Sequence, residues 1–476
     1  MRFRLQLIGQ NSYMLSARIF TLAITFLITA MSARFLVTVM DFGQLILISA
    51  YYIFLREISV FSFKTYLVRE IIKNKEQPMP ALTHIFLFSS ILIISGAMLI
   101  AGILYSLGYS RSIIILSMAL NLSLIFEVFI HNNESYFESH KRFDHLFYSH
   151  FTYGVLRILL FLGINLNNPT LTGIISSFIF SSFAGSLAHV FILHNYLIKK
   201  KDYALSKSRI KKTFVISAIF FVSSIFYGLL NSLDIMILSK LSGNISVGLF
   251  APAARMNKFC FIYAFSFISV LYPHFVSFLN NDPEKLPAFA GKSFTFIIFS
   301  IIPLQFLFPY VAKYVIYFFF GSQYSASILL LKILIFCQMP FAVYFFCSRY
   351  FLALHREKLT VLIDFLSLLF HFSALIFFIR IFDKMGAAIG VVSTNIFLAV
   401  IYLIFLKRQK ISFPYIKILF KNLIFLIITG FFFMMTFSEV YQPFHDIISM
   451  VIIIAISLAA FFMMKELEFI RKRKKI

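Results

Sequence analysis

The chain has 476 residues, of which 60% are hydrophobic, 18% aromatic and only 13% charged. A soluble domain needs about 25% charged residues to cover its surface, so this composition excludes soluble enzymes, disordered regulators and secreted disulfide scaffolds. The net charge of +24 is typical of a membrane protein with basic cytoplasmic loops, and no soluble basic module that would bind nucleic acid is visible.

Apolar runs long enough to cross a membrane follow one another along the whole chain. The first run, 14–37, is too long for the apolar core of a cleaved signal peptide, so we interpret it as an uncleaved helix. Fourteen spans are expected, at 14–37, 44–63, 81–105, 112–131, 147–165, 170–196, 213–239, 246–275, 293–318, 326–350, 359–380, 386–406, 419–438 and 447–464.

Basic residues orient these spans. The loops after even-numbered spans, together with both ends of the chain, hold most of the Lys and Arg outside the spans. Because Lys and Arg concentrate on the cytoplasmic side, both ends of the chain are predicted to be cytoplasmic. The opposite loops hold only Arg111, Lys240, Lys313, Arg380 and Lys384.

The densest basic loop divides the first twelve spans into two sets of six. We expect an N-terminal six-helix bundle at 1–198, a basic cytoplasmic linker at 199–212, a C-terminal six-helix bundle at 213–406, and two extra helices with a basic cytoplasmic tail at 407–476. Paired bundles are typical of transporters, whose site lies between two repeats.

A weak internal echo links the two halves. Asp41-Phe42-Gly43 ends the turn after the first span, and Ser246-Val247-Gly248 ends the turn after the seventh. The loops on the outer side are short, and no segment outside the membrane is long enough to fold as a domain. Any chemistry is therefore expected within the helices.

Charged residues inside the spans indicate the function. A charge at the bilayer centre costs about 2.5–3.5 kcal/mol, so such residues face a water-filled cavity, a partner charge or the interface. Arginine matches phosphate with a planar fork, which favours a cargo lipid that carries phosphate or pyrophosphate. The candidates for a cationic substrate-binding cavity are Arg18, Arg34, Arg56, Arg157, Arg255 and Lys258. Snorkelling toward the interface stays open for Arg18 and Arg34.

Two carboxylates, Glu57 and Asp234, are candidates for ion coupling or for a salt bridge. Asp234 is expected at the depth of Arg255 on the next helix, where the two would pair. The three cysteines and the histidines show no metal-ligand spacing, and no Gly-rich phosphate loop is present. We therefore expect neither a metal nor a cofactor, and no ATP hydrolysis.

Several short motifs resemble bacterial polysaccharide flippases of the O-antigen (Wzx-like) branch, within the multidrug/oligosaccharidyl-lipid/polysaccharide flippase superfamily. The first hairpin carries this resemblance in Ser32-Ala33-Arg34-Phe35-Leu36 and Asp41-Phe42-Gly43, although Val37 stands where the family pattern has Gly. Later family positions match Asn231-x-x-Asp234, Val247-Gly248-Leu249-Phe250, Ala253-Ala254-Arg255, Leu271-Tyr272-Pro273, Gly321-x-x-Tyr324 and Gly386-Ala387-Ala388.

The resemblance implies an all-α polytopic protein of the bacterial cytoplasmic (inner) membrane, with two six-helix bundles in a V shape plus two C-terminal helices. It implies alternating access that moves undecaprenyl-pyrophosphate-linked oligosaccharide, such as the O-antigen unit of lipopolysaccharide, from the inner to the outer leaflet. In such proteins cavity arginines bind the pyrophosphate or acidic sugars, and the resemblance implies this role for Arg34, Arg56 and Arg255. The implied partners are this substrate, membrane lipids and other membrane proteins of glycan assembly.

Two other functions stay open. A multidrug or cation extruder of the same superfamily is expected to have an acidic cavity, which disagrees with the surplus of Arg and Lys inside the spans. A membrane-embedded glycan polymerase is expected to have long external loops or clustered His, Asp and Glu at one membrane face. Neither feature is visible here, so we do not expect an enzyme.

Overall fold

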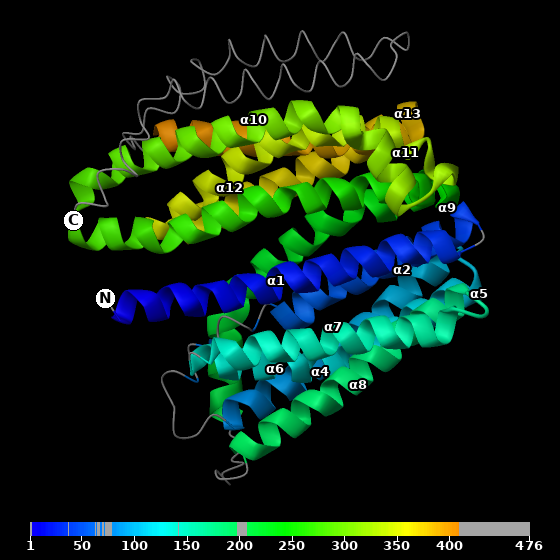
Figure 1. Cartoon of the computed structure of the whole chain (residues 1–476), viewed down its shortest axis with the longest axis horizontal. Coiled ribbons are helices and arrows are strands. Elements are labelled where there is room, and N and C mark those ends of the chain that lie inside the picture. The colour runs from blue at the N-terminus through cyan, green and yellow to red at the C-terminus, as the bar shows by residue number, and fades with distance from the viewer. Residues whose placement is uncertain are drawn as a thin grey trace. The chain divides into compact units, whose positions relative to one another are not determined.

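The computed structural model describes residues 2–36, 38–61, 63, 67–68, 71, 79–140, 142–197 and 207–408. Every regular element in these ranges is a helix, which confirms the all-α class (Figure 1). Eight helices of this described part are long and apolar enough to cross a membrane. The expected spans 419–438 and 447–464 and the linker residues 199–206 lie outside the described residues, so the count of fourteen stays a prediction.

The helices follow the apolar runs in chain order. The first are α1 (Arg2–Phe35), α2 (Val39–Arg56), the π-helix η1 (Glu57–Phe61), α4 (Met79–Ser106), α5 (Arg111–Leu122), α6 (Leu124–Ser139), α7 (Phe143–Asn165) and α8 (Leu171–Leu197). The later ones are α9 (Lys207–Asn281), η2 (Pro283–Lys285), α10 (Leu286–Phe319), η3 (Ser322–Tyr324), α11 (Ser327–Leu334), η4 (Ile335–Cys337), α12 (Gln338–Ala353) and α13 (Glu357–Arg408).

Two of these helices, α9 and α13, each contain two of the expected spans. A straight helix of 75 residues would be about 110 Å long, several times the hydrocarbon thickness of a membrane. Gly243, with φ of 82°, interrupts α9, and Asp383, with φ of 51°, interrupts α13. Glycine adopts a positive φ without steric cost. Asp383 is held there by Ser246, whose hydroxyl donates to its Oδ1 at 2.9 Å.

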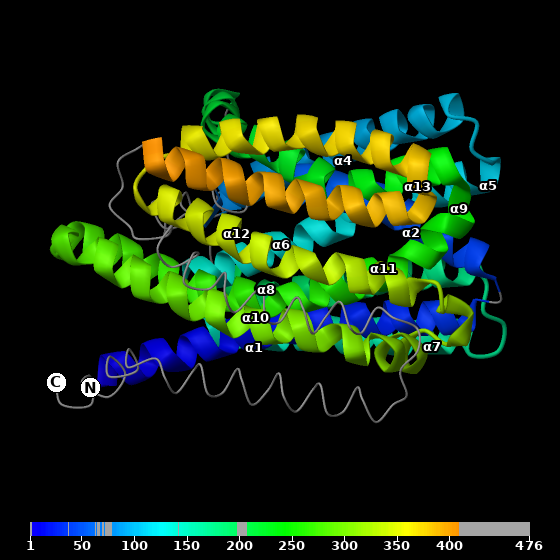
Figure 2. The same ribbon diagram turned by 90° about the horizontal axis from the view of Figure 1, so that it is seen from above.

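The described helices form two compact units. Unit 1 comprises Met1–Ala251 and Ile379–Lys384, and unit 2 comprises Pro252–Phe378 and the described residues from Met385 onward. In unit 1, α7 packs between α1 and α8, and α4 packs against α5 and α6 (Figure 1). In unit 2, α10 packs against α11 and α12 (Figure 2). The change of unit falls inside α9, and the domain bounds expected from the sequence stay a prediction.

The two segments of the internal echo lie against each other within unit 1. A Cβ atom added at Gly43 would lie 1.8 Å from the backbone oxygen of Asn244, and one added at Gly248 would lie 2.2 Å from that of Val39. No side chain fits at either distance. Both glycines are therefore required because the start of α2 and the turn in α9 approach each other backbone to backbone.

Replacing Gly248 by Ala is expected to lower the free energy of unfolding by about 1–3 kcal/mol, because the added methyl group forces the two backbones apart. Gly102→Ala is the matched control, since Gly102 also lies in an apolar helix but has nothing within 4 Å of its added Cβ. The midpoint of thermal unfolding of the two purified variants in detergent measures the difference. Equal midpoints would show that the close contact is dispensable.

Candidate functional site

A buried carboxylate, Glu127 on α6, is the centre of a polar cluster in unit 1. Its Oε1 accepts hydrogen bonds from the Tyr52 hydroxyl and, at 3.3 Å, from the Tyr153 hydroxyl. Its Oε2 lies 3.6 Å from Arg56 Nε. Helices α2, α6 and α7 therefore meet at one charged group. We call Tyr52, Arg56, Glu127, Tyr153 and Arg157 the Glu127 cluster.

The spacing along α2 and α7 explains how the cluster forms. Tyr52 and Arg56 are four residues apart on α2, and Tyr153 and Arg157 are four residues apart on α7. Residues at this spacing lie on one face of a helix, one turn from each other. Each helix thus presents the same pair, a tyrosine followed one turn later by an arginine. Tyr52, Arg56 and Tyr153 contact the single carboxylate on α6, and Arg157 acts on it electrostatically.

Arg157 contributes the second positive charge of the cluster. Its guanidinium carbon lies 5.0 Å from the centre of the Phe178 ring on α8, and it attracts Glu127 electrostatically. The Nε atom of Arg157 is buried and has no hydrogen-bond partner among the described residues. A buried donor without a partner in the protein usually donates to a bound water molecule or a ligand.

Within the cluster itself, two arginines and one carboxylate leave one positive charge in excess, and Glu57, next to Arg56 in the chain, is a second carboxylate that attracts Arg56. Arginine forks form charge-assisted hydrogen bonds with phosphate and carboxylate groups. In a low-dielectric site between apolar helices, an excess positive charge attracts anions more strongly than it would in water. The arrangement suits the binding of an oxyanion.

A second buried carboxylate, Glu134, lies two turns further along α6. His131 Nδ1 lies 2.9 Å from its Oε2, and His150 Nε2 on α7 lies 3.2 Å from its Oε1. The other ring nitrogen of His150 lies 3.0 Å from the hydroxyl of Thr21 on α1. This Glu134 cluster, composed of Thr21, His131, Glu134 and His150, links α1, α6 and α7.

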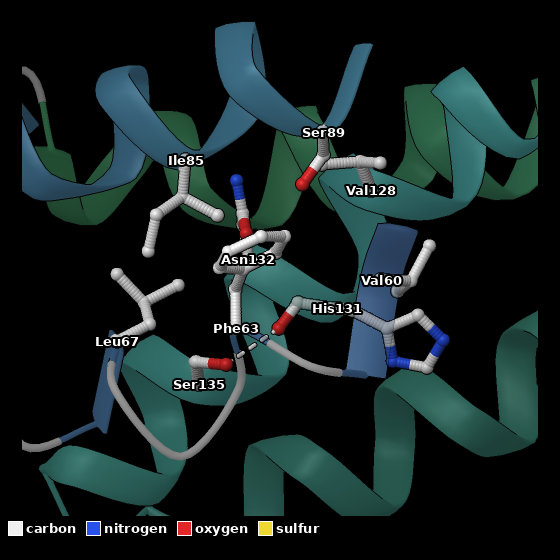
Figure 3. A pocket seen from close by; sticks show the side chains of 9 residues that line it. All are labelled: Val60, Phe63, Leu67, Ile85, Ser89, Val128, His131, Asn132 and Ser135. Atoms are coloured by element: carbon white, nitrogen blue, oxygen red, sulfur yellow. Dashed lines mark hydrogen bonds between the residues drawn. The ribbon is translucent and has the colours of Figure 1, made fainter. Parts of the chain in front are cut away.

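A small cavity lies beside His131, with room for about one water molecule. Figure 3 shows its lining of Val60, Phe63, Leu67, Ile85, Ser89, Val128, His131, Asn132 and Ser135. The Ser89 hydroxyl is buried there without a hydrogen-bond partner among the described residues, which suits a bound water molecule. The cavity is far too small for a lipid head group, so it is not a substrate site.

Of the residues expected in a cationic cavity, the structure brings Arg56 and Arg157 together. Arg34 is exposed in the last turn of α1, where its charge also suits the helix C-terminus. Glu57 follows Arg56 as the first residue of η1, and its Cβ lies 3.3 Å from the position of a Cβ added at Gly228 on α9. Asp234 is buried on α9 and accepts a hydrogen bond from the backbone of Ile235 at 2.9 Å.

Arg255 and Lys258 belong to unit 2, where Arg255 is half-buried and Lys258 is exposed. The side chain of Arg18 lies outside the described residues. A shared cavity of these residues with Arg56, and the pairing of Asp234 with Arg255, therefore stay predictions. Within the part of the chain that the structure describes, no group of three His, Cys, Asp or Glu side chains could hold a metal ion.

Comparison with known proteins agrees with the fold. Among solved structures, a lipid II flippase MurJ in an inward closed conformation matches with a TM-score of 0.74 at 17% identity, covering 96% of this chain and 99% of that one. An inward-facing multidrug resistance MATE family transporter of the MOP superfamily matches with a TM-score of 0.65 at 14% identity, covering 84% and 94%. A MOP superfamily transporter from Pyrococcus furiosus matches with a TM-score of 0.59 at 15% identity, covering 85% and 95%.

At these identities the likeness shows the fold alone. No curated protein sequence matches the chain significantly. Residues 31–329, however, match the model of a family described as polysaccharide biosynthesis protein. This match extends over more than half of the chain and confirms the resemblance seen in the sequence. The chain therefore belongs to the polysaccharide biosynthesis protein family, and it has the fold of MurJ and MATE transporters.

Proposed function

We propose that this protein moves an undecaprenyl-pyrophosphate-linked oligosaccharide from the inner to the outer leaflet of a bacterial cytoplasmic membrane by alternating access, with both ends of the chain in the cytoplasm. The observation that carries the proposal is the Glu127 cluster, in which Arg56 pairs with a buried carboxylate and Arg157 attracts the same carboxylate among apolar helices. Charges at this depth are costly and mark substrate pathways. A pyrophosphate linkage is the anionic group that every such lipid-linked glycan shares.

Family membership supports the glycan part of the proposal, since the matching family takes part in polysaccharide biosynthesis. The likeness to a structure named as a lipid II flippase supports a lipid-linked cargo. An O-antigen unit is the form that we favour for the cargo. Other membrane proteins of glycan assembly are its proposed partners, and ion coupling at Glu57 or Asp234 belongs to the same proposal.

A multidrug extruder is the second candidate, because MATE transporters share the fold. The Glu127 cluster disfavours it, since the one carboxylate that the cluster offers to a cationic drug is already paired with Arg56. A membrane-embedded glycan polymerase is disfavoured as well. The His and Glu side chains of the Glu134 cluster contact one another where three helices pack, and the cavity beside His131 has room for only about one water molecule.

Deletion of the gene from its native strain tests the proposal. We expect undecaprenyl-pyrophosphate-linked repeat units to accumulate on the inner leaflet, and wild-type protein to cure this accumulation. Arg157→Ala is expected to leave most of the accumulation in place, because the cluster then loses its excess positive charge. Arg111→Ala, at the exposed start of α5, is the matched control and should restore transport fully.

Mass spectrometry of extracted lipids and immunoblots of surface glycan measure the result. An unchanged surface glycan without accumulated lipid in the deletion strain would contradict the flippase. Increased sensitivity of that strain to cationic drugs would then favour the extruder.

A further inference from the structure

We propose that Glu127 is an internal substitute for the substrate: it occupies Arg56 in the empty protein, and the substrate's pyrophosphate takes its place there. The inference rests on the proposed function and names how that site binds and releases its ligand. Three features of the Glu127 cluster support it, namely the hydrogen bonds of the carboxylate, the difference in exposure across the ion pair, and the position of Arg157.

The two oxygens of Glu127 have different partners. Oε1 accepts from the hydroxyls of Tyr52 and Tyr153, whereas Oε2 lies 3.6 Å from Arg56 Nε, which is longer than a normal hydrogen bond. When Arg56 leaves, the carboxylate therefore keeps both phenol donors. A buried carboxylate that keeps its hydrogen bonds is far less costly than one left bare. The tyrosines thus make the exchange of Arg56 between two anions feasible.

The side chains of Arg56 and Glu127 differ in solvent exposure. The side chain of Arg56 is 32% exposed, whereas that of Glu127 is 8% exposed. The Nε atom of Arg56 is itself buried, but the exposed part of the side chain gives a phosphate group a path to Arg56 that does not first reach the carboxylate. The approach leads to competition between two anions for one cation, rather than to direct contact between the two anions.

Arg157 keeps the exchange electrically balanced. It attracts Glu127 from α7 while its guanidinium rests against the Phe178 ring. After Arg56 has turned to the substrate, Glu127 still has one positive neighbour. The pyrophosphate then pairs with Arg56, and no buried charge is left without a counter-charge. On release of the substrate, Glu127 reclaims Arg56, so the carboxylate lowers the affinity and thereby speeds the release.

Equilibrium binding to the purified full-length protein in nanodiscs tests the exchange, with undecaprenyl pyrophosphate, undecaprenol and inorganic pyrophosphate as probes. Glu127→Gln removes the competing charge but keeps an acceptor for both tyrosines. We expect this variant to bind undecaprenyl pyrophosphate about tenfold more tightly than wild type, because one charged competitor for Arg56 has been removed. Its transport in cells should nevertheless fall, because release is slower.

Two further variants separate the exchange from a structural role. Glu134→Gln also replaces a buried carboxylate on α6 by a neutral amide, but this carboxylate contacts histidines. The affinity of this variant for undecaprenyl pyrophosphate should stay within about twofold of wild type. Tyr153→Phe removes one donor from Glu127, so the carboxylate holds Arg56 more firmly and the affinity should fall about threefold.

Tighter binding combined with slower transport supports the exchange, because damage to the fold would lower both. Binding by Glu127→Gln that is equal to or weaker than wild type overturns it, as does an equal gain in Glu134→Gln. If wild type binds undecaprenyl pyrophosphate no better than undecaprenol, the proposed function itself fails. A gain seen with inorganic pyrophosphate alone would replace the lipid by a free anion as the ligand and overturn the inference as stated.

Discussion

Replacing Arg56 by Met and Glu127 by Gln in the same chain leaves the protein folded but abolishes glycan transport. The double variant removes both charges of the buried pair, so neither remains without its partner. The amide oxygen introduced at position 127 would still accept the hydrogen bonds of Tyr52 and Tyr153. The pyrophosphate, however, loses the guanidinium that binds it. Transport is expected to fall to below about 1% of wild type, in line with the loss of a buried charge pair at an interface.

The single variants show why both changes are needed. Arg56→Met alone leaves Glu127 with a weaker counter-charge and should lower the free energy of unfolding by about 3–5 kcal/mol. Arg56→Glu, a simple charge reversal, would place two carboxylates side by side and would damage the fold as well as the site. Immunoblots of surface glycan measure transport, and thermal unfolding in detergent measures folding. Normal surface glycan from a folded double variant would contradict a binding role for Arg56.

The helices could be predicted from the sequence because apolar runs alone determine them. The interruptions in α9 and α13 fall at Gly243 and Asp383, between spans that the sequence already separates. The position of Arg56 and Arg157 within apolar helices could also be predicted, since both residues lie inside apolar runs. The face that each helix buries against its neighbours could not be predicted. A helix that is apolar on all sides has no polar stripe to indicate which face is buried.

Glu127 was visible as one of few acidic residues inside the spans, but its partners lie 75 and 26 residues away in the sequence. The signal that would have found them is the repeated Tyr-x-x-x-Arg spacing at Tyr52 and Tyr153. Glu134 was missed for a different reason. The expected fourth span ends at residue 131, whereas α6 continues to Ser139, so a residue assigned to a loop is buried in a helix.

A large loss of stability is expected from Glu134→Leu. Leucine fills a similar volume but removes the carboxylate that both His131 and His150 contact. The two half-buried imidazoles lose that acceptor, and the link from His150 to Thr21 on α1 loses its support. We expect the free energy of unfolding to fall by about 3–5 kcal/mol. Glu134→Gln keeps one acceptor and should lose about half as much, because only the charge is removed.

Thermal unfolding of the purified variants measures this loss, and an unchanged midpoint for Glu134→Leu would show that the Glu134 cluster does not hold α1 against α6 and α7. Transport per folded molecule should stay near wild type in this variant, because the Glu127 cluster keeps all of its members. The Arg56→Met/Glu127→Gln variant has the opposite phenotype, a folded protein without transport. Two buried carboxylates two turns apart on one helix are thus expected to separate stability from substrate binding, since one is contacted by histidines that join helices and the other by an arginine that can bind a phosphate instead.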